Sequence, residues 1–335
     1  MATIREVSKE AGVSRATVTR VLQTPEKVAS KTRERVQAAI KKLDYRPNML
    51  SQTFRNKRSN TIVVMVPNIA NPLFAKIISG IETVTQKHGY NLLLGDTHNS
   101  SELEAHYINL VETQLAAGVL QLSSYSMRNS PLPNPNIKAV GIAGTDNTCG
   151  AEFPTVRIDS VEAAKTAVNY LINQGHKRIA VITGPKDNSN TEQRLEGYRT
   201  SLGSAGIAID TDIIFEGDFR LASGQSAVTR MLKQTSELPT AIFCMNDEMA
   251  IGAINGLSSA GLTVPEDMSV IGFDDIDFAA FVTPQLTTIA QPANEMGQRG
   301  ATLLIQMIEE QSPSDQDIVL PFEFVVRNSV SKIEP

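Results

Sequence analysis

The residues near the N-terminus whose types and spacing could do chemistry lie in the segment GVSRATVTRVL, residues 12–22. Arg15 and Arg20 carry planar guanidinium groups, which can bond bidentately to O6 and N7 of guanine in the major groove of DNA. Ala16 offers a methyl group that suits the methyl group of thymine. Hydroxyl and ammonium groups can fix a protein on the phosphates without reading sequence. The segment therefore predicts DNA contacts, with phosphate binding expected from Thr17, Thr19, Lys31 and Thr32, and with Ser14 as a further DNA-binding candidate.

The sequence lacks the patterns of catalytic chemistry. It contains no G-x-x-x-x-G-K-[ST], no G-x-G-x-x-G and no G-x-S-x-G motif, which would cradle phosphates, bind a dinucleotide or present a nucleophile. Its two cysteines and four histidines show no spacing typical of metal ligands. We therefore expect a protein that is not an enzyme and that needs neither a metal nor another cofactor.

The charge of the chain is unevenly distributed. Residues 1–60 hold 14 Lys and Arg against five Asp and Glu, a net of +9, whereas the whole chain of 335 residues carries −5. The remainder therefore carries −14. A basic region ahead of an acidic body indicates two partners of different character, and the basic part is typical of a nucleic-acid binder.

Three helices are predicted before residue 45. Thr3 and Glu6 form a capping-box pattern ahead of a helix over residues 4–11. Gly12 breaks that helix, and Ser14 can cap a second helix over residues 15–22. A third helix is expected over residues 31–43. Two helices joined by a glycine-containing turn form a helix-turn-helix, whose second helix enters the major groove. Residues 1–46 are therefore expected to form a DNA-binding head.

From residue 61 onward, apolar runs alternate with helical patterns. Strands are expected over 61–67, 90–96, 118–123, 178–184, 240–245 and 269–274, and helices over 72–88, 102–117, 160–174, 194–205 and 248–260. Two runs of strand–helix units predict an α/β body with two doubly wound lobes. The first lobe would hold residues 61–158 and 292–320, and the second 159–291 and 321–335. Ligands of such sheets bind beyond the carboxyl ends of the strands, so a cleft between the lobes is expected.

Residues 3–58 resemble the head of the LacI/GalR family of bacterial repressors, through TIREVSKEAGVSRATVTRVL and VASKTRERVQAAIKKLDYRPN. The resemblance continues across nearly the whole chain. It implies a hinge over residues 47–60, with a short helix that folds on operator DNA and inserts a side chain into the minor groove. Phe54 stands where the family has leucine, and phenylalanine is a known wedge of this kind. Arg55 keeps the hinge cationic, and the resemblance also implies DNA contacts from Tyr45 and Asn48.

The body resembles the cleft of ribose-type periplasmic binding proteins, and this resemblance implies the effector site. Arg194 matches an arginine that binds sugar hydroxyls, Asp274 matches a partner of those hydroxyls, and Phe219 matches an aromatic ring that stacks on the sugar. Each of these residue types can make the contact that the resemblance implies. Asn246 has a competing role, because Asn-Asp ahead of a helix also reads as an N-cap. The implied effector residues are Asn71, Leu73, Phe74, Asn190, Arg194, Phe219, Asn246, Asp274 and Gln291.

The expected class of effector follows from a position at which this chain differs from the ribose-binding proteins. Ribose-binding proteins carry an Asp-Arg pair where this chain has Ala143 and Gly144, which argues against free ribose and opens space for a base on the sugar. The segment LPTAIFCMNDEMAIGAI also resembles the cytidine and purine repressors. The expected function is a sequence-specific DNA-binding repressor controlled by a small ligand, with a ribonucleoside as the first choice and a pentose or other sugar as the second. A constitutive architectural DNA-binding protein is the alternative from another class.

The expected partners follow from the head and the body. One short helix reads too few base pairs alone, so a homodimer on a palindromic operator in double-stranded DNA is expected. A tetramer is not expected, because no apolar heptad series follows the last strand. The sequence shows neither a membrane span nor a secretory signal. We therefore expect a cytoplasmic protein without a membrane partner.

Overall fold

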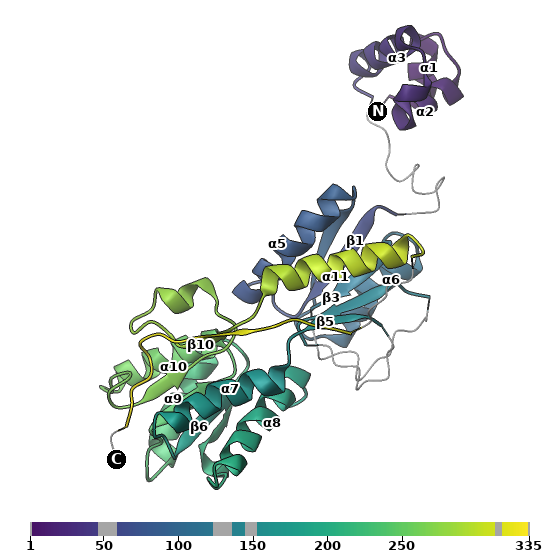
Figure 1. Cartoon of the computed structure of the whole chain (residues 1–335). Helices are drawn as coiled ribbons and strands as arrows, with labels where there is room; N and C mark the ends of the chain where they lie inside the picture. Colours follow the sequence, from purple (N-terminus) through teal and green to yellow (C-terminus); the bar gives the residue numbers. More distant parts are fainter. Residues whose placement is uncertain (1, 46–58, 123–135, 145–152, 312–316, 334–335) are drawn as a thin grey trace. The chain divides into compact units, whose positions relative to one another are not determined.

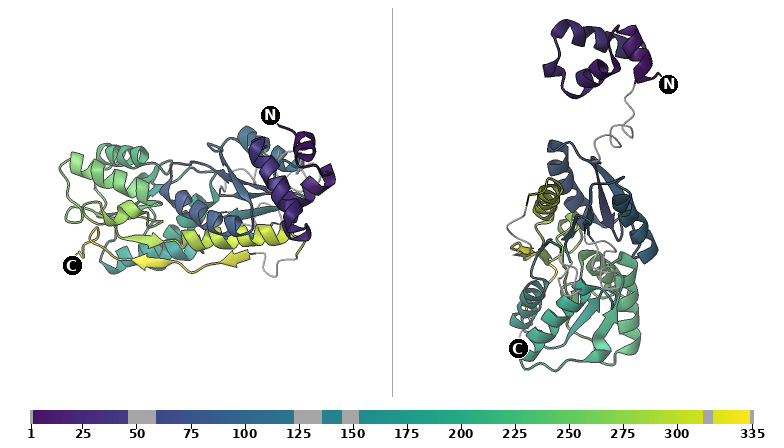
Figure 2. Two further views of the ribbon diagram at one scale, coloured as in Figure 1. Left: turned by 90° about the horizontal axis from the view of Figure 1, so that it is seen from above. Right: turned by 90° about the vertical axis from the view of Figure 1, so that its right-hand side faces the viewer.

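The structure is a computed structural model that describes residues 2–45, 59–122, 136–144, 153–311 and 317–333. The chain divides into two units, Met1–Arg58 and Ser59–Pro335, which are described separately. The first is a small helical unit, and the second is an α/β body with helices on both faces of its sheets (Figures 1 and 2).

The first unit contains the predicted helix-turn-helix. Helix α1 (Ile4–Glu10) begins at Thr3 with a complete capping box, and α2 (Arg15–Gln23) is capped by Ser14. A short 3-10 turn (Pro25–Lys27) leads to α3 (Ser30–Lys42). A small core holds the three helices together; it consists of Val7, Ala11, Val18, Val21, Val36 and Ala39.

The turn between α1 and α2 is fixed by a side chain from α3. Gly12 adopts φ +62°, a left-handed conformation that glycine accepts most readily. The Arg35 guanidinium donates to the carbonyl oxygen of Ala11 at 2.6 Å. This bond satisfies a carbonyl at the end of α1, so it holds the two helices at the angle that presents α2.

The first lobe of the body is built on a six-stranded parallel sheet in the order β11-β5-β4-β3-β1-β2. Helices α5 (Pro72–Lys87) and α11 (Ala293–Ile308) cover one face, and α6 (Ser101–Glu112) covers the other. The alternating side chains of β1 divide between the two hydrophobic clusters on these faces. The strands are β1 (Thr61–Val66), β2 (Asn91–Asp96), β3 (Gly118–Gln121), β4 (Ala139–Ile142), β5 (Thr155–Arg157) and β11 (Asp317–Val319).

The second lobe has a four-stranded parallel sheet in the order β7-β6-β8-β9. Its strands are β6 (Ile179–Thr183), β7 (Ile214–Glu216), β8 (Ala241–Cys244) and β9 (Ser269–Ile271). Helices α7 and α8 pack together, as do α9 and α10. Their bounds are α7 (Ser160–Asn173), α8 (Ser189–Ser204), α9 (Leu221–Gln234) and α10 (Asp247–Ser259). Short 3-10 turns lie at Thr211–Ile213 and Asp277–Ala280.

The lobes are joined by extended segments from distant parts of the sequence. Strand β10 (Thr288–Ala290) pairs antiparallel with β12 (Glu323–Val325). Strand β11 lies just before β12 in the chain but belongs to the first-lobe sheet. The C-terminal segment, yellow in Figure 1, thus extends along both lobes. The two-lobed α/β body and the helical head agree with the predicted fold class.

Several predicted bounds differ from the structure. The helix expected over 194–205 begins at Ser189, because the side chain of Asn188 accepts from the Thr191 amide and caps it there. The helix expected over 102–117 ends at Glu112, and Gln114 adopts a left-handed φ of +59°. Helices α9 and α11 were not predicted at all; each begins without a side-chain hydrogen bond at its N-cap.

Candidate functional site

Helix α2 presents a cationic surface to solvent. Arg15, Ala16 and Arg20 are exposed, whereas Val18 and Val21 are buried in the head core. Neither arginine forms an ion pair with a described residue. Both guanidinium groups are therefore available for contacts outside the unit.

The hydroxyl residues of α2 are partly engaged within the helix. The side chains of Ser14 and Thr17 lie 2.9 Å apart and cap the helix together, and the Thr19 hydroxyl donates to the Arg15 carbonyl oxygen. Lys31 and Thr32 lie in the first turn of α3, and the N-terminal end of a helix favours phosphate oxygens. Tyr45 packs against the head core. The predicted hinge contacts of Asn48, Phe54 and Arg55 lie outside the described residues.

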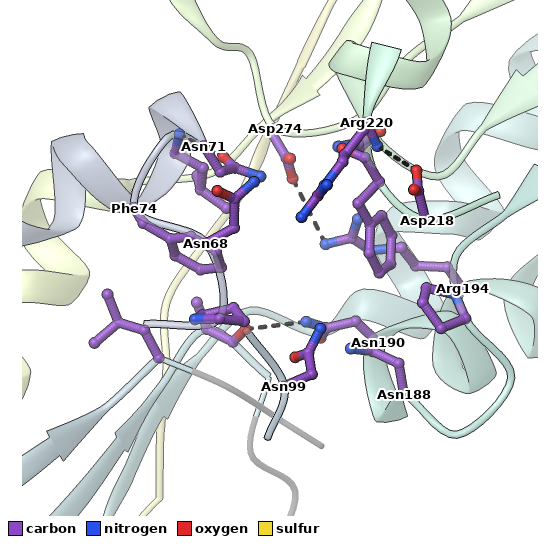
Figure 3. Close-up of a pocket in the computed structure, with 17 residues that line it drawn as sticks. Asn68, Asn71, Phe74, Asn99, Asn188, Asn190, Arg194, Asp218, Arg220 and Asp274 are labelled. Atoms are coloured by element: carbon purple, nitrogen blue, oxygen red, sulfur yellow. Dashed lines mark hydrogen bonds and ion pairs between the residues drawn. The ribbon is translucent and has the colours of Figure 1, made fainter. Parts of the chain in front are cut away.

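A cavity of about 290 Å³ opens between the two lobes of the body. Figure 3 shows its walls, with side chains from both lobes pointing inward. Eight of the nine predicted effector residues line it, and the ninth, Gln291, does not. The sequence analysis did not assign Pro67, Asn68, Asn99, Leu122, Ala143, Pro185, Asn188, Asp218 and Arg220, which also line it.

The first-lobe wall is built around the start of α5. Asn71 caps this helix, because its side-chain oxygen accepts from the Leu73 amide at 2.9 Å. The cap places Leu73 and Phe74 in the first turn, where both line the cavity. Asn99 enters from the loop after β2 with a left-handed φ of +57°. This wall therefore combines an apolar surface with amide groups.

A buried ion pair forms the polar centre of the second-lobe wall. Arg194 on α8 and Asp274 after β9 are each 4% exposed, and Nη2 of Arg194 lies 3.6 Å from Oδ1 of Asp274. The guanidinium also donates to the Met245 carbonyl oxygen and lies over the Phe273 ring, 3.7 Å from its centroid. Gln291 donates to Asp274 at 2.7 Å. Gln291 therefore supports Asp274 instead of lining the cavity.

Burial governs the protonation of these groups. Burial raises the pKa of Asp274 to about 6, although Arg194, Gln291 and Lys76 oppose the shift. Burial disfavours the charged form of Arg194 as well, which lowers the pKa of its guanidinium, and the nearby Asp274 carboxylate opposes that change. An arginine this close to a carboxylate stays charged near neutral pH. The pair can accept and donate hydrogen bonds to neighbouring hydroxyls of one ligand.

Effector binding is expected to weaken as the pH falls through 6. Protonation of Asp274 removes the acceptor of ligand hydroxyls, and with its pKa raised to about 6 the carboxylate fraction at pH 5 is about tenfold below that at pH 7. Effector affinity should fall by a similar factor, as measured by titration at both pH values. In Asp274→Asn the affinity should already be low at pH 7 and change less with pH. A flat profile in the unsubstituted protein would contradict this assignment.

Phe219 supplies an aromatic wall held in an unusual backbone conformation. Its φ is +65°, a region rarely adopted by bulky residues. The Asn246 amide donates to the Phe219 carbonyl oxygen at 2.9 Å, and its oxygen accepts from Met249 as the N-cap of α10. Asn246 therefore does serve as a cap, while also lining the cavity. The Phe219 ring lies against Gly184, where a Cβ atom would overlap it.

The substitution Gly184→Ala is expected to weaken effector binding without affecting operator binding. The added methyl group would displace the Phe219 ring that lines the cavity. An aromatic packing contact contributes about 0.5–1.5 kcal/mol, so the loss of the contact between the ring and the ligand should lower effector affinity by roughly 2- to 13-fold. The matched control is Gly203→Ala, whose Cβ would meet no atom within 4 Å. Equal effector affinity in both variants would show that the ring position does not matter.

Two clasps join the lobes at the rims of the cleft. In the first, Asn190 donates to the Ala143 carbonyl oxygen at 3.0 Å, and Ser189 donates to that of Gly144 at 2.5 Å. In the second, Lys76 on α5 lies 2.8 Å from Asp277 and donates to the Asp275 carbonyl oxygen. Asn190 thus uses an amide hydrogen between lobes while also lining the cavity.

Within the described part of the chain, no cluster of His, Cys, Asp and Glu could hold a metal ion. Among the same residues, no helix is long and apolar enough to cross a membrane.

Comparisons with known proteins agree with this architecture. A family model described as bacterial regulatory proteins, lacI family, matches residues 3–48, and a periplasmic binding protein-like domain matches residues 168–330. The HTH-type transcriptional repressor CytR of Escherichia coli (strain K12) is 38% identical over 98% of this chain and 96% of its own length. The repressor PurR of Aliivibrio salmonicida is 33% identical over 99% of this chain and 100% of its own.

The chain is also similar in structure to a solved repressor. The lac repressor dimer bound to operator and the anti-inducer ONPF matches with a TM-score of 0.87 at 27% identity, covering 98% of this chain and 99% of that one. The similarity therefore spans head and body together.

Proposed function

The chain belongs to the lacI family of bacterial regulatory proteins, and we propose that the effector that controls it is a ribonucleoside bound between its two lobes. It is a DNA-binding transcriptional repressor with a ligand-binding body, and it is not an enzyme. We assign operator contacts to the exposed face of α2 and the first turn of α3. Base reading falls to Arg15 and Arg20.

The observation that carries the nucleoside proposal is the composition of the cavity. One part holds the buried Arg194–Asp274 pair, which suits neighbouring hydroxyls of a ribose. The rest combines the rings of Phe74 and Phe219 with asparagine amides. Aromatic faces pack on flat bases, and amides match the donors and acceptors along a base edge. The related repressors CytR and PurR support this choice.

We propose that the protein acts as a homodimer in the cytoplasm, on a palindromic operator. The lac repressor structure in the comparison is a dimer bound to operator. Two heads on a two-fold axis would read two half-sites, and residues 47–60 would form the hinge between head and body. An effector that contacts both lobes favours one lobe–lobe angle by its differential affinity, and this couples the cavity to operator binding.

The test is operator affinity with and without cytidine, adenosine, ribose and common hexoses. A shift by a nucleoside supports the proposal, and the sign of the shift distinguishes an inducer from a corepressor. A shift by ribose or a hexose alone would replace the nucleoside with a sugar. Operator binding that no ligand changes would indicate a constitutive architectural protein.

A further inference from the structure

Arg220 brings a second guanidinium group into the cavity. It follows Phe219 directly in sequence, lines the cavity and is exposed. Figure 3 shows its side chain extending into the cavity toward Asn68. Arg194 is held by Asp274, Met245 and Phe273, whereas the Arg220 guanidinium has no ion pair or hydrogen bond with any described residue. A charged, multivalent donor is thus left available to a ligand.

The loop that carries Arg220 is fixed by its own hydrogen bonds. The Arg220 amide donates to Oδ1 of Asp218 at 3.0 Å, and the Ser223 hydroxyl donates to the Arg220 carbonyl oxygen at 2.8 Å. Asn246 holds the neighbouring Phe219 carbonyl oxygen. The backbone position of Arg220 is therefore set before a ligand arrives, which lowers the entropy cost of using it.

Three of the asparagines that line the cavity share one orientation of their amide groups. The side-chain oxygens of Asn68, Asn71 and Asn188 each accept a backbone N–H, from Ala70, Leu73 and Thr191. Because a backbone N–H needs an acceptor, these bonds fix which end of each amide is the oxygen. The three NH2 groups have no partner among the described residues. They remain as donors, as does the buried and unpartnered Nε of Arg194.

The acidic groups offset only part of this excess of donors. Oδ1 of Asp274 already pairs with Arg194 and accepts from Gln291, and Oδ1 of Asp218 accepts the Arg220 amide. Burial raises the pKa of Glu248, on the first turn of α10, to about 7, and Asp274 adds to that shift while Arg220 opposes it. The cavity is therefore rich in donors, and its complement is a group rich in acceptors.

We propose that the effector carries an oxyanion group, bound between the Arg220 guanidinium and the NH2 groups of Asn68 and Asn71, which lie opposite it in Figure 3, and that within the nucleoside class this group is a phosphate. The nucleoside class of the ligand rests on the proposed function, whereas the oxyanion group does not depend on it. A guanidinium fork matches the tetrahedral oxygens of a phosphate bidentately, and each amide can add one hydrogen bond. A neutral nucleoside would offer the guanidinium no negatively charged group.

The test compares ligand pairs that differ only in a phosphate: cytidine and cytidine 5′-monophosphate, adenosine and adenosine 5′-monophosphate, ribose and ribose 5-phosphate. Binding to the full-length protein is measured by titration calorimetry, and operator affinity is measured in parallel. A charge-assisted hydrogen bond contributes about 1.5–3 kcal/mol, so the phosphorylated member should bind roughly tenfold or more tightly. An equal or tighter affinity for the unphosphorylated member of each pair overturns the inference.

Two substitutions locate the effect. Arg220→Met keeps most of the unbranched apolar stem but removes the guanidinium group, so it should remove the preference for the phosphorylated ligand. Asn68→Asp keeps the acceptor for the Ala70 amide but replaces the NH2 donor with an oxygen. It should therefore lower the affinity for the phosphorylated ligand more than the affinity for the unphosphorylated ligand of the same pair. Arg199 is an exposed residue on α8 outside the cavity. The control Arg199→Met should change neither the affinity for the phosphorylated ligand nor that for the unphosphorylated one. Equal losses for both members of a pair in Arg220→Met would contradict the assignment.

The outcomes separate this inference from the nucleoside proposal. Free nucleosides that shift operator binding while their monophosphates do not would support the proposed function and overturn the oxyanion group. A response to ribose 5-phosphate but to no nucleoside or nucleotide would retain the oxyanion group and exclude the base. If no phosphorylated ligand binds, the oxyanion group is excluded.

Discussion

The substitution Arg194→Ala is expected to abolish the effector response while operator binding without effector stays unchanged. Arg194 is 4% exposed, and it pairs with Asp274 inside the cavity. Its removal deletes the donor to ligand hydroxyls and leaves the buried carboxylate without its cation. A hydrogen bond from a charged group contributes about 1.5–3 kcal/mol, so the loss of the donor to the ligand should lower effector affinity by roughly tenfold or more. Operator titrations with and without the active ligand measure it.

The matched control is Arg199→Ala, which removes an exposed arginine from the same helix. Effector response should persist there. Thermal melting of both variants separates loss of binding from loss of folding, because the deletion of a buried ion-pair partner also destabilises the body. A folded Arg194→Ala protein that still responds to the ligand would show that the effector binds elsewhere.

The substitution Arg20→Ala is expected to weaken operator binding and to relax the preference at one base pair of each half-site. An exposed arginine on the second helix of a helix-turn-helix contributes about 1–3 kcal/mol when it reads guanine. In a dimer two heads lose this contact, so operator affinity should fall by the product of two such factors. Binding to operators with each base substituted in turn identifies the position that is read.

Lys31→Ala is the matched comparison for Arg20→Ala. Lys31 lies in the first turn of α3, and a phosphate contact there would weaken operator and random DNA alike and reduce the dependence of binding on salt. If Arg20→Ala instead lowers affinity for operator and random DNA by the same factor, Arg20 is a phosphate contact and base reading falls to Arg15.

The elements that the sequence predicted are largely those with local signals. Helices α1, α2, α5 and α10 start at Thr3, Ser14, Asn71 and Asn246, and each of these caps through its own side chain. Helices α9 and α11 start at Arg220 and Pro292 without such a bond, so no local residue marks them. Their positions depend on packing against α10 and α5, which a single sequence does not reveal.

The cavity residues also divide into those that the sequence indicates and those that depend on the folded conformation. Arg194 lies on a predicted helix and Asp274 ends a predicted strand, and the topology of parallel sheets brings them to one edge. Phe219 follows β7, which was not predicted, and was assigned only through the resemblance to ribose-type binding proteins. Asn99 and Arg220 were missed because loop conformation, including the left-handed φ values of Asn99 and Phe219, decides where they point. Gln291 was expected in the cavity, but a hydrogen bond to Asp274 takes its side chain.

The two clasps at Asn190 and Lys76 also bear on how fast the repressor responds. Each links one lobe to the other directly, beside a cavity whose walls come from both lobes. A movement of one lobe against the other has to break such contacts, and lobe motions of this kind occur on microsecond to millisecond timescales. The rate at which a bound effector can change the lobe–lobe angle is therefore bounded by the breaking of these contacts, and beyond a certain concentration more effector does not shorten the response.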